Sequence, residues 1–431
     1  MSGTPLIVFT VEIALMLACG IGCGYLMRRL HQPAVLGEML GGIILGPTIF
    51  GALLPTWQSA LFPVDGMVAA ARDGTIKLGM LFFLFMIGLD IDLGTLRRYG
   101  WNALCVGLMG TAAPLAVGAA LVYLLPGVFE PLDGVQRWTL ALFLGASLAN
   151  SANPVLARIL LDLGLLKDKL GAVLMTATLI DDLICWSLLA VTVGQTSGHA
   201  AAGIEGALVP SIGSSVLLGL ATVFGFFLAM VALGRWVATP LLRRGRKSLP
   251  WPAGFMGTAI VLLLGTAAAA EACGIHAFLG PFLLGLALAP TNAERREAYD
   301  VMNGFVFSFF VPIYFVSMGL TANFVGDFQF TLVAVIFIAA CVSKFFSAYA
   351  GARMSGLDKK TSWAVGCGMN ARGAVGIILA GIGLESGVIG RPTYVALVLM
   401  ALVTSLMAGP MMKFFLASHE GALEGLKEAR A

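Results

Sequence analysis

Charged residues are scarce in this chain. Asp, Glu, Lys and Arg make up 11% of its 431 residues, whereas about a quarter of the residues in a soluble domain are charged. Long polar stretches are missing as well, and hydrophobic residues account for 59% of the chain. These deficits exclude a soluble globular protein and leave no room for a sizeable soluble domain. The sequence therefore predicts an all-α membrane protein.

Metal-binding and redox motifs are also missing. The seven cysteines include no C-x-x-C pair, and the four histidines are not spaced as metal ligands. A membrane enzyme acting on polyprenyl diphosphates needs aspartate clusters such as DDxxD to hold magnesium, but the aspartate pair here reads DDLIC and has no second cluster. We therefore predict no enzyme activity and no cofactor. The net charge of +3 lies in the loops, so membrane lipid is the expected contact and nucleic acid is not indicated.

Apolar stretches long enough to cross a membrane follow one another along the chain. A spanning helix needs about 20 largely apolar residues, and this criterion predicts thirteen helices. The first one lacks the basic segment and cleavage site of a signal peptide, so we expect it to be retained. The predicted spans are 5–26, 33–54, 76–94, 101–125, 138–163, 169–194, 208–236, 253–272, 276–290, 301–322, 328–351, 361–387 and 392–416.

Basic residues predict how these spans are oriented. Arg and Lys accumulate on the cytoplasmic side of membrane proteins. Loops after even-numbered spans contain little beyond Arg72, Arg137 and Arg391. We therefore expect a multi-pass protein of the bacterial inner membrane with its N-terminus outside and its C-terminus in the cytoplasm. The loops after odd-numbered spans are the basic ones, with Arg28, Arg29, Arg97, Arg98, Lys167, Lys169, Arg243, Arg244, Arg246, Lys247, Arg295, Arg296, Arg353, Lys359 and Lys360.

Two sequence patterns recur seven spans apart. GGIILGPTIF at 41–50 is echoed by AFLGPFLLGL at 277–286, and FMIGLDIDL at 85–93 by FVSMGLTANF at 315–324. An odd offset gives the two copies opposite orientations, so the pattern predicts inverted repeats of six helices each. The predicted organisation is one transmembrane domain over 1–431. It contains a first repeat at 1–200, a linker helix at 208–236, a second repeat at 252–416 and a short cytoplasmic tail at 417–431.

Three ionisable residues stand out within the predicted spans. Asp181 and Asp182 fall near the middle of the span at 169–194, and Lys344 lies about two turns inside the cytoplasmic end of the span at 328–351. Burying a charge in a span costs at least about 2.5 kcal/mol, so each is a candidate functional residue. Neighbouring helix positions differ by about 100°, so one carboxylate can line a cavity while the other meets a partner helix. Lys344 can pair with one of them or extend to the cytoplasm.

Two spans are predicted to be broken. Polar or helix-breaking residues lie in the middle of the fifth span and of the twelfth, again seven spans apart. Paired discontinuous helices are the strongest sequence indication of a transport site, and carbonyls freed at the breaks can coordinate a cation, although a simple proline kink would also fit the fifth span. The candidate residues along the ion path are Asn150, Ser151, Asn153, Thr178, Asn370 and Arg372, with Glu38 and Glu271 as secondary candidates.

The same segments resemble a known family. Six segments are similar, in order, to signature segments of the cation/proton antiporter-2 family of Kef-like and sodium/proton exchangers. They are AVLGEMLGGIILGP, FLFMIGLDIDL, the stretch from NPVLARILLDL to TLIDDLICW, GIHAFLGPFLLGLALAP, SKFFSAYAGARMSGL and GMNARGAVGIILA. The resemblance implies a mobile core with two crossed broken helices, packed on a dimerisation domain of a homodimer. It also implies transport by an elevator-like movement.

The resemblance assigns roles to particular residues. It places the family's essential ion-binding carboxylate at Asp182, the preceding acid at Asp181 and the core lysine at Lys344, an arrangement similar to that of electrogenic members. The chain departs from the usual pattern at Gly376, where an acid is common, and at Asn150 and Asn153, where the segment is usually rich in Thr, Ala and aromatic residues. The nucleotide-binding domain of Kef proteins is not expected after the last span.

These observations lead to a functional hypothesis. A carboxylate that binds either a proton or a cation suffices for antiport, so we expect exchange of a monovalent cation, Na⁺ or else K⁺, for protons. Two alternatives stay open at this point. A Kef-like potassium efflux channel would use the same residues without obligatory exchange, and a sodium-coupled solute symporter would need a roomier polar pocket.

Overall fold

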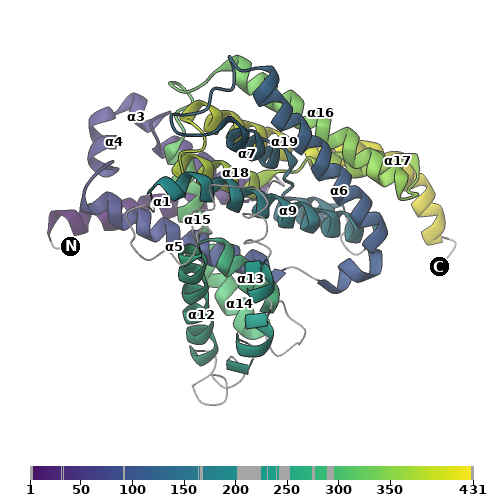
Figure 1. Ribbon diagram of the computed structural model, residues 1–431, viewed down its shortest axis with the longest axis horizontal. Helices are drawn as coiled ribbons and strands as arrows, with labels where there is room; N and C mark the ends of the chain where they lie inside the picture. Colours follow the sequence, from purple (N-terminus) through teal and green to yellow (C-terminus); the bar gives the residue numbers. More distant parts are fainter. Residues whose placement is uncertain are drawn as a thin grey trace. The chain divides into compact units, whose positions relative to one another are not determined.

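We describe the fold from a computed structural model of the protein. Its description covers residues 3–30, 32, 34–90, 93–163, 165, 168–200, 225–230, 232–238, 240–241, 253–273, 277–288 and 296–428. All regular elements within these residues are helices (Figure 1). The predicted all-α class is therefore confirmed for this part of the chain.

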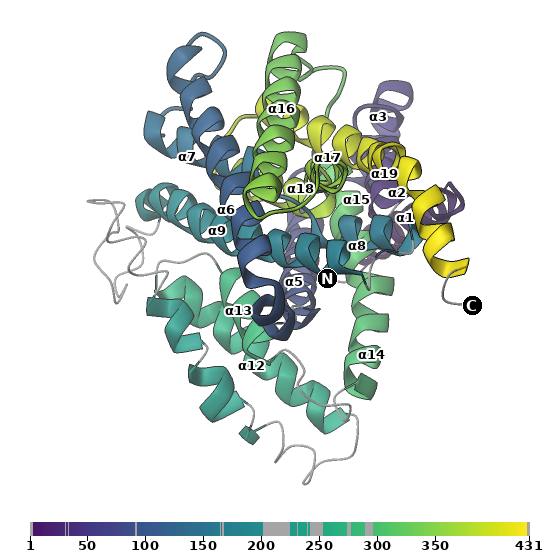
Figure 2. The same ribbon diagram turned by 90° about the vertical axis from the view of Figure 1, so that its right-hand side faces the viewer.

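The described helices are drawn and labelled in Figures 1 and 2. Most are apolar, and η3 and η5 are short π-helical segments. The first nine are α1 (Thr4–Arg29), α2 (Ala34–Leu45), α3 (Phe50–Leu53), α4 (Pro55–Leu61), α5 (Met67–Asp90), α6 (Leu93–Leu124), α7 (Arg137–Ala149), α8 (Asn153–Asp162) and α9 (Lys169–Ala200). The others are η3 (Gly234–Ala238), α12 (Ala253–Ala272), α13 (Leu279–Leu288), α14 (Arg296–Phe305), η5 (Val306–Phe310), α15 (Val311–Thr321), α16 (Phe330–Met354), α17 (Lys359–Met369), α18 (Gly373–Glu385) and α19 (Arg391–Glu428).

Within the described residues, 7 helical stretches are long and apolar enough to cross a membrane. Shorter apolar helices include α7, α13 and most of α12 and α18. The protein is thus a multi-pass membrane protein. Both spans predicted to be broken are divided, one into α7 and α8 and the other into α17 and α18. The predicted linker helix at 208–236 lies mostly outside the described residues.

One predicted boundary was wrong for a physical reason. The third span was predicted from residue 76, but α5 already begins at Met67, so that Arg72 lies inside the helix. The guanidinium of Arg72 is 2.7 Å from Oε1 of Glu12, a fully buried acid of α1, and it also donates to the carbonyl of Pro63 at 3.2 Å. This pairing lets a basic residue stand in a helix where its charge alone suggested a loop.

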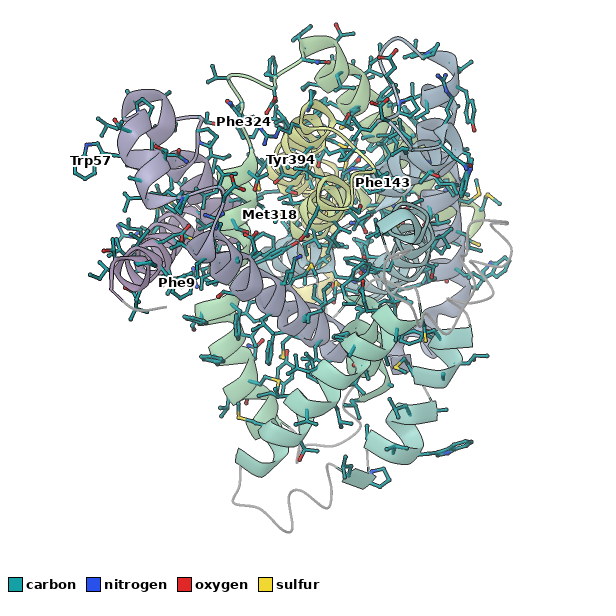
Figure 3. The ribbon with its side chains drawn as sticks, turned by 60° about the vertical axis from the view of Figure 1, so that its left-hand side comes forward. Phe9, Trp57, Phe143, Met318, Phe324 and Tyr394 are labelled. Atoms are coloured by element: carbon teal, nitrogen blue, oxygen red, sulfur yellow. The ribbon has the colours of Figure 1, made fainter. Side chains whose placement is uncertain are left out.

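The chain forms two compact units, each made of two separate stretches of sequence. Unit 1 comprises Met1–Leu93 and Val193–Gly326, and unit 2 comprises Gly94–Thr192 and Asp327–Ala431. Each unit has its own buried side chains. Phe143 and Tyr394 are buried in unit 2, whereas Trp57 of unit 1 points outward from α4 (Figure 3).

Two helix crossings without intervening side chains stabilise unit 1. Helix α2 packs on α15, and α5 packs on α13. At the first crossing a Cβ on Gly42 would overlap the carbonyl of Val316, and at the second a Cβ on Gly88 would overlap the carbonyl of Phe282. Only glycine permits such close backbone approach. The crossings join the second predicted span to the tenth and the third to the ninth.

Unit 2 contains both broken helices. Helices α16, α17 and α19 pack against one another, α7 contacts α16 and α18, and α8 contacts α18 and α19. Asp358 caps the start of α17 by accepting the N–H of Thr361 at 3.0 Å. The buried acids of α9 and the lysine of α16 all belong to this unit.

Candidate functional site

The two chain breaks meet directly. Residues 150–152 separate α7 from α8, and residues 370–372 separate α17 from α18. The backbone N–H of Ala152 donates to the carbonyl of Ala371 at 2.6 Å, so each break satisfies a polar group of the other. Irregular backbone at membrane depth needs such internal partners because no lipid group can supply them.

Local sequence explains why the helices stop here. Pro154 is the second residue of α8, where its missing N–H is not needed by the helix. Gly373, the first residue of α18, has a φ of 42°, a left-handed conformation that favours glycine. Its backbone N–H is taken up by the hydroxyl of Ser405 at 2.7 Å.

Asp181 is surrounded by hydrogen-bond donors from three directions. Its side chain is fully buried on α9. The Thr111 hydroxyl of α6 donates to Oδ1, and the Lys344 ammonium of α16 donates to Oδ2. The Ser151 hydroxyl in the first break lies 2.9 Å from Oδ2 and 2.7 Å from the carbonyl of Met369, so its one proton can serve either acceptor. Both oxygens of Asp181 are therefore engaged.

Asp182 is equally buried but less fully bonded. Its Oδ2 accepts the side-chain amide N–H of Asn153 at 2.7 Å. The hydroxyl of Thr178, one turn earlier on α9, donates to Oδ1 of Asn153 and thereby orients that amide. Oδ1 of Asp182 has no partner among the described residues. A buried carboxylate oxygen without a donor is costly, which leaves this atom available to a proton or a cation.

Two buried cations cover the C-terminal end of α7. Lys344 donates to the carbonyl of Ala149 as well as to Asp181. Arg372 donates to the carbonyls of Ser147, Leu148 and Asn150, and at 2.8 Å to that of Ala340 on α16. Positive charge stabilises the negative end of a helix dipole. These two side chains thus donate hydrogen bonds to the carbonyls that the break leaves without helical partners.

The amides at the breaks are only partly bonded. The Asn150 side chain is fully buried, and neither of its polar atoms has a partner within the described part of the chain. Asn370 donates from Nδ2 to the carbonyl of Cys341 at 3.2 Å, while its Oδ1 lacks a donor there. Polar groups that a ligand or water can still engage thus remain at both breaks.

The secondary candidates do not share this environment. Glu38 is a buried residue of α2, and Glu271 lies near the end of α12, where it accepts the backbone N–H of Ala277 at 2.8 Å. Both belong to unit 1. No group of three His, Cys, Asp or Glu side chains that could hold a metal ion occurs in the searched, described residues.

Sequence reasoning missed two partners of the site. Thr111 was not selected because a single threonine in an apolar span is unremarkable, and threonine can satisfy its hydroxyl on a helix carbonyl. The Thr111 hydroxyl does lie 2.8 Å from the carbonyl of Gly107, so its one proton can serve either that carbonyl or Oδ1 of Asp181. The Ala149 carbonyl was not named as a partner of Lys344. The predicted break after it was the available signal, because the last carbonyls of a helix lack intrahelical donors.

Broken helices whose breaks meet beside buried carboxylates are typical of secondary transporters. This is the class of protein to which the fold and the site point.

The comparisons with known proteins identify the family within that class. The transmembrane sodium/hydrogen exchanger family matches residues 13–418, so the chain belongs to this family of monovalent cation:proton antiporters.

Relatives match along almost the entire chain. It is 29% identical over 432 residues to Cation/H(+) antiporter 18 of Arabidopsis thaliana, covering 99% of this chain and 51% of that protein. It is 29% identical over 415 residues to Na(+)/H(+) antiporter NhaS4 of Synechocystis sp., covering 95% of this chain and 98% of that protein. The chain thus spans about half the length of the plant relative.

A solved structure shares the fold. The sodium proton antiporter MjNhaP1 from Methanocaldococcus jannaschii superposes with a TM-score of 0.65 at 15% identity, covering 97% of this chain and 98% of that one. This likeness concerns the fold alone.

Proposed function

We propose that the protein exchanges a monovalent cation for protons across the membrane and that Asp182 is the site both occupy. The observation that carries the proposal is that Oδ1 of the fully buried Asp182, in the unit where the two chain breaks meet, has no hydrogen-bond partner among the described residues. The family supports it, and the names of the relatives describe Na⁺/H⁺ or cation/H⁺ antiport.

Competition at one carboxylate produces the coupling. A proton neutralises Asp182 on Oδ1 without disturbing the neighbouring groups, because Asn153 already donates to the other oxygen. A cation neutralises it by direct contact instead, and the side-chain oxygens of Asn153 and Thr178 lie beside it as further hard ligands. Since the buried site tolerates one positive charge at a time, loading the cation expels the proton. Na⁺ is the cation we favour, with K⁺ as the second choice.

Asp181 and Lys344 form the supporting pair in this scheme. Their charges compensate each other in the empty site, and the ammonium also holds the end of α7. A cation arriving at the neighbouring Asp182 repels that ammonium, so a second proton leaves from Lys344. The exchange is then electrogenic, with two protons for each cation.

Flux through proteoliposomes tests both steps. In wild-type protein, an imposed Na⁺ or K⁺ gradient should drive protons in the opposite direction and so change the pH of the lumen. Asp182→Asn should abolish this pH change, while the variant still elutes normally on size-exclusion columns. Undiminished exchange in folded Asp182→Asn protein refutes the site. Dissipation of either gradient alone indicates a channel. For Lys344→Gln, an unchanged response to an imposed membrane potential would refute the second proton.

The overall organisation belongs to the same proposal. We include in it thirteen spans with the N-terminus outside, two inverted repeats at 1–200 and 252–416, and a linker helix at 208–236. Two observations support the repeats: the paired glycine crossings of unit 1 and the paired breaks of unit 2 each bring together a helix from the first half of the chain and one from the second half. We take unit 2 as the mobile core and unit 1 as the dimerisation domain of a homodimer in the bacterial inner membrane. Native mass spectrometry that finds only monomer would contradict the dimer.

A further inference from the structure

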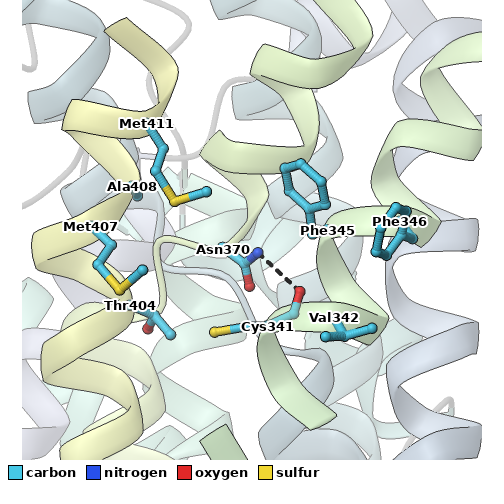
Figure 4. A pocket seen from close by; sticks show the side chains of 9 residues that line it. All are labelled: Cys341, Val342, Phe345, Phe346, Asn370, Thr404, Met407, Ala408 and Met411. Atoms are coloured by element: carbon cyan, nitrogen blue, oxygen red, sulfur yellow. Dashed lines mark hydrogen bonds between the residues drawn. The ribbon is translucent and has the colours of Figure 1, made fainter. Parts of the chain in front are cut away.

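An apolar cavity lies in unit 2 between α16 and α19 (Figure 4). Its volume is about 200 Å³. Phe345 and Phe346 line it from α16, Met407 and Met411 from α19, and Asn370 from the break after α17. No lining residue carries a charge, so the cavity is unsuited to ions.

One polar atom in the cavity lacks its hydrogen bond. The Asn370 side chain is only 9% exposed and donates one amide N–H to the carbonyl of Cys341. Its Oδ1 has no donor among the described residues. The nearby Thr404 hydroxyl in the same lining donates to the carbonyl of Met400 at 2.7 Å and thus provides no proton for Asn370. A buried acceptor in this state is stabilised by any molecule that brings a donor.

The cavity is open to the surroundings of the helices. Its rim residues Val342 and Phe346 are 50% and 54% exposed, and Met407 is 40% exposed. All three stand on helices long and apolar enough to span the membrane. A molecule dissolved in the hydrocarbon region can therefore reach the cavity without crossing a polar barrier.

Size and lining define the occupant. An apolar cavity of about 150 Å³ holds one benzene ring, so this slightly larger one accommodates a flat bicyclic molecule. Methionine sulfur and phenylalanine edges make favourable contacts with aromatic rings. A lipid acyl chain would fill the space but has no donor for Asn370.

We propose that this cavity binds a neutral, flat, largely apolar molecule of bicyclic aromatic size, whose single N–H or O–H group donates to Oδ1 of Asn370. The proposal does not depend on the ion-exchange scheme, because neither Asp181 nor Asp182 lines the cavity.

The experiment compares two probes of nearly identical shape. 5-Fluoroindole carries the N–H donor, and 5-fluoro-1-benzothiophene has sulfur in its place. Binding to the full chain in detergent is followed by ¹⁹F NMR, with protein-free micelles as the reference for partitioning. We expect saturable binding of 5-fluoroindole at one site and roughly three- to tenfold weaker binding of the benzothiophene, the range that one neutral hydrogen bond gives.

Two variants locate the site. Val342→Trp places an indole over the mouth of the cavity, whereas Ile338→Trp adds the same side chain one turn away, at a position that is 59% exposed and outside the lining. Saturable binding should disappear in Val342→Trp and persist in Ile338→Trp. Equal affinity for the two probes would overturn the donor assignment. Absence of saturable binding, or binding that survives Val342→Trp, would overturn the site.

Discussion

The Asp181–Lys344 pair allows the sharpest test of the site's energetics. Both side chains are fully buried, and they are in direct contact. Removing one partner of a buried pair leaves an uncompensated charge and costs about 3–5 kcal/mol, whereas removing both together costs far less. We therefore expect Lys344→Met and Asp181→Asn each to lower stability by about 3–5 kcal/mol. At roughly 2 °C per kcal/mol for a unit of this size, the melting temperature should fall by about 6–10 °C.

The double variant separates pairing from packing. The side-chain oxygen introduced by Asp181→Asn would still accept from Thr111, and its NH2 group can donate to the Ser151 hydroxyl. The combined change should therefore cost only about 1–2 kcal/mol, the value of the lost bond to Ala149 and some packing. Thermal unfolding in detergent at neutral pH measures all three variants, with Lys413→Met, at an exposed lysine of α19, as the control. Additive losses in the double variant would show that the two charges do not compensate each other, and the reasoning would fail.

Two further predictions concern the frame around the site. Gly42→Ala should destabilise the protein by several kcal/mol because its methyl would overlap the Val316 carbonyl. Gly74→Ala, in a helix with open space around it, should instead raise stability by about 0.5–1 kcal/mol. Equal melting temperatures for the two variants would argue against the close crossing. A cysteine replacing the exposed Lys359 should react with a membrane-impermeant maleimide only from the cytoplasm, and one replacing the exposed Asp133 only from outside. Labelling of both positions from the same side would exclude the proposed orientation.

Much of the fold could be predicted from the sequence because the signals are local. Apolar runs between short polar segments locate the spans, and the Asn-Ser-Ala-Asn-Pro and Asn-Ala-Arg-Gly segments interrupt two of them where the structure has its breaks. Asp181 and Asp182 were selected because a charge in an apolar span is costly wherever it points.

Partners distant in sequence could not be predicted in the same way. Thr111 is 70 residues from Asp181, and nothing in its own segment indicates which hydroxyl faces the acid. The carbonyls at the end of α7 were expected to be available to a cation, yet Lys344 and Arg372 use them, since side-chain reach rather than sequence decides this. Glu12 was overlooked although it is buried in a span, and its partner Arg72 was placed in a loop.

The interleaving of the two units has a consequence for biogenesis. A ribosome releases Asp181 and Asp182 into the membrane well before Lys344, which follows Asp181 by 163 residues. At about 5–20 residues per second, the acids wait roughly 8–30 s for their buried counter-charge. During that interval the contacts of Asp181 and α7 with α16 cannot form, although the second stretch of unit 1, Val193–Gly326, is already being synthesised. Nascent chains stalled before α16 should therefore be the species that membrane quality-control proteases and insertases encounter.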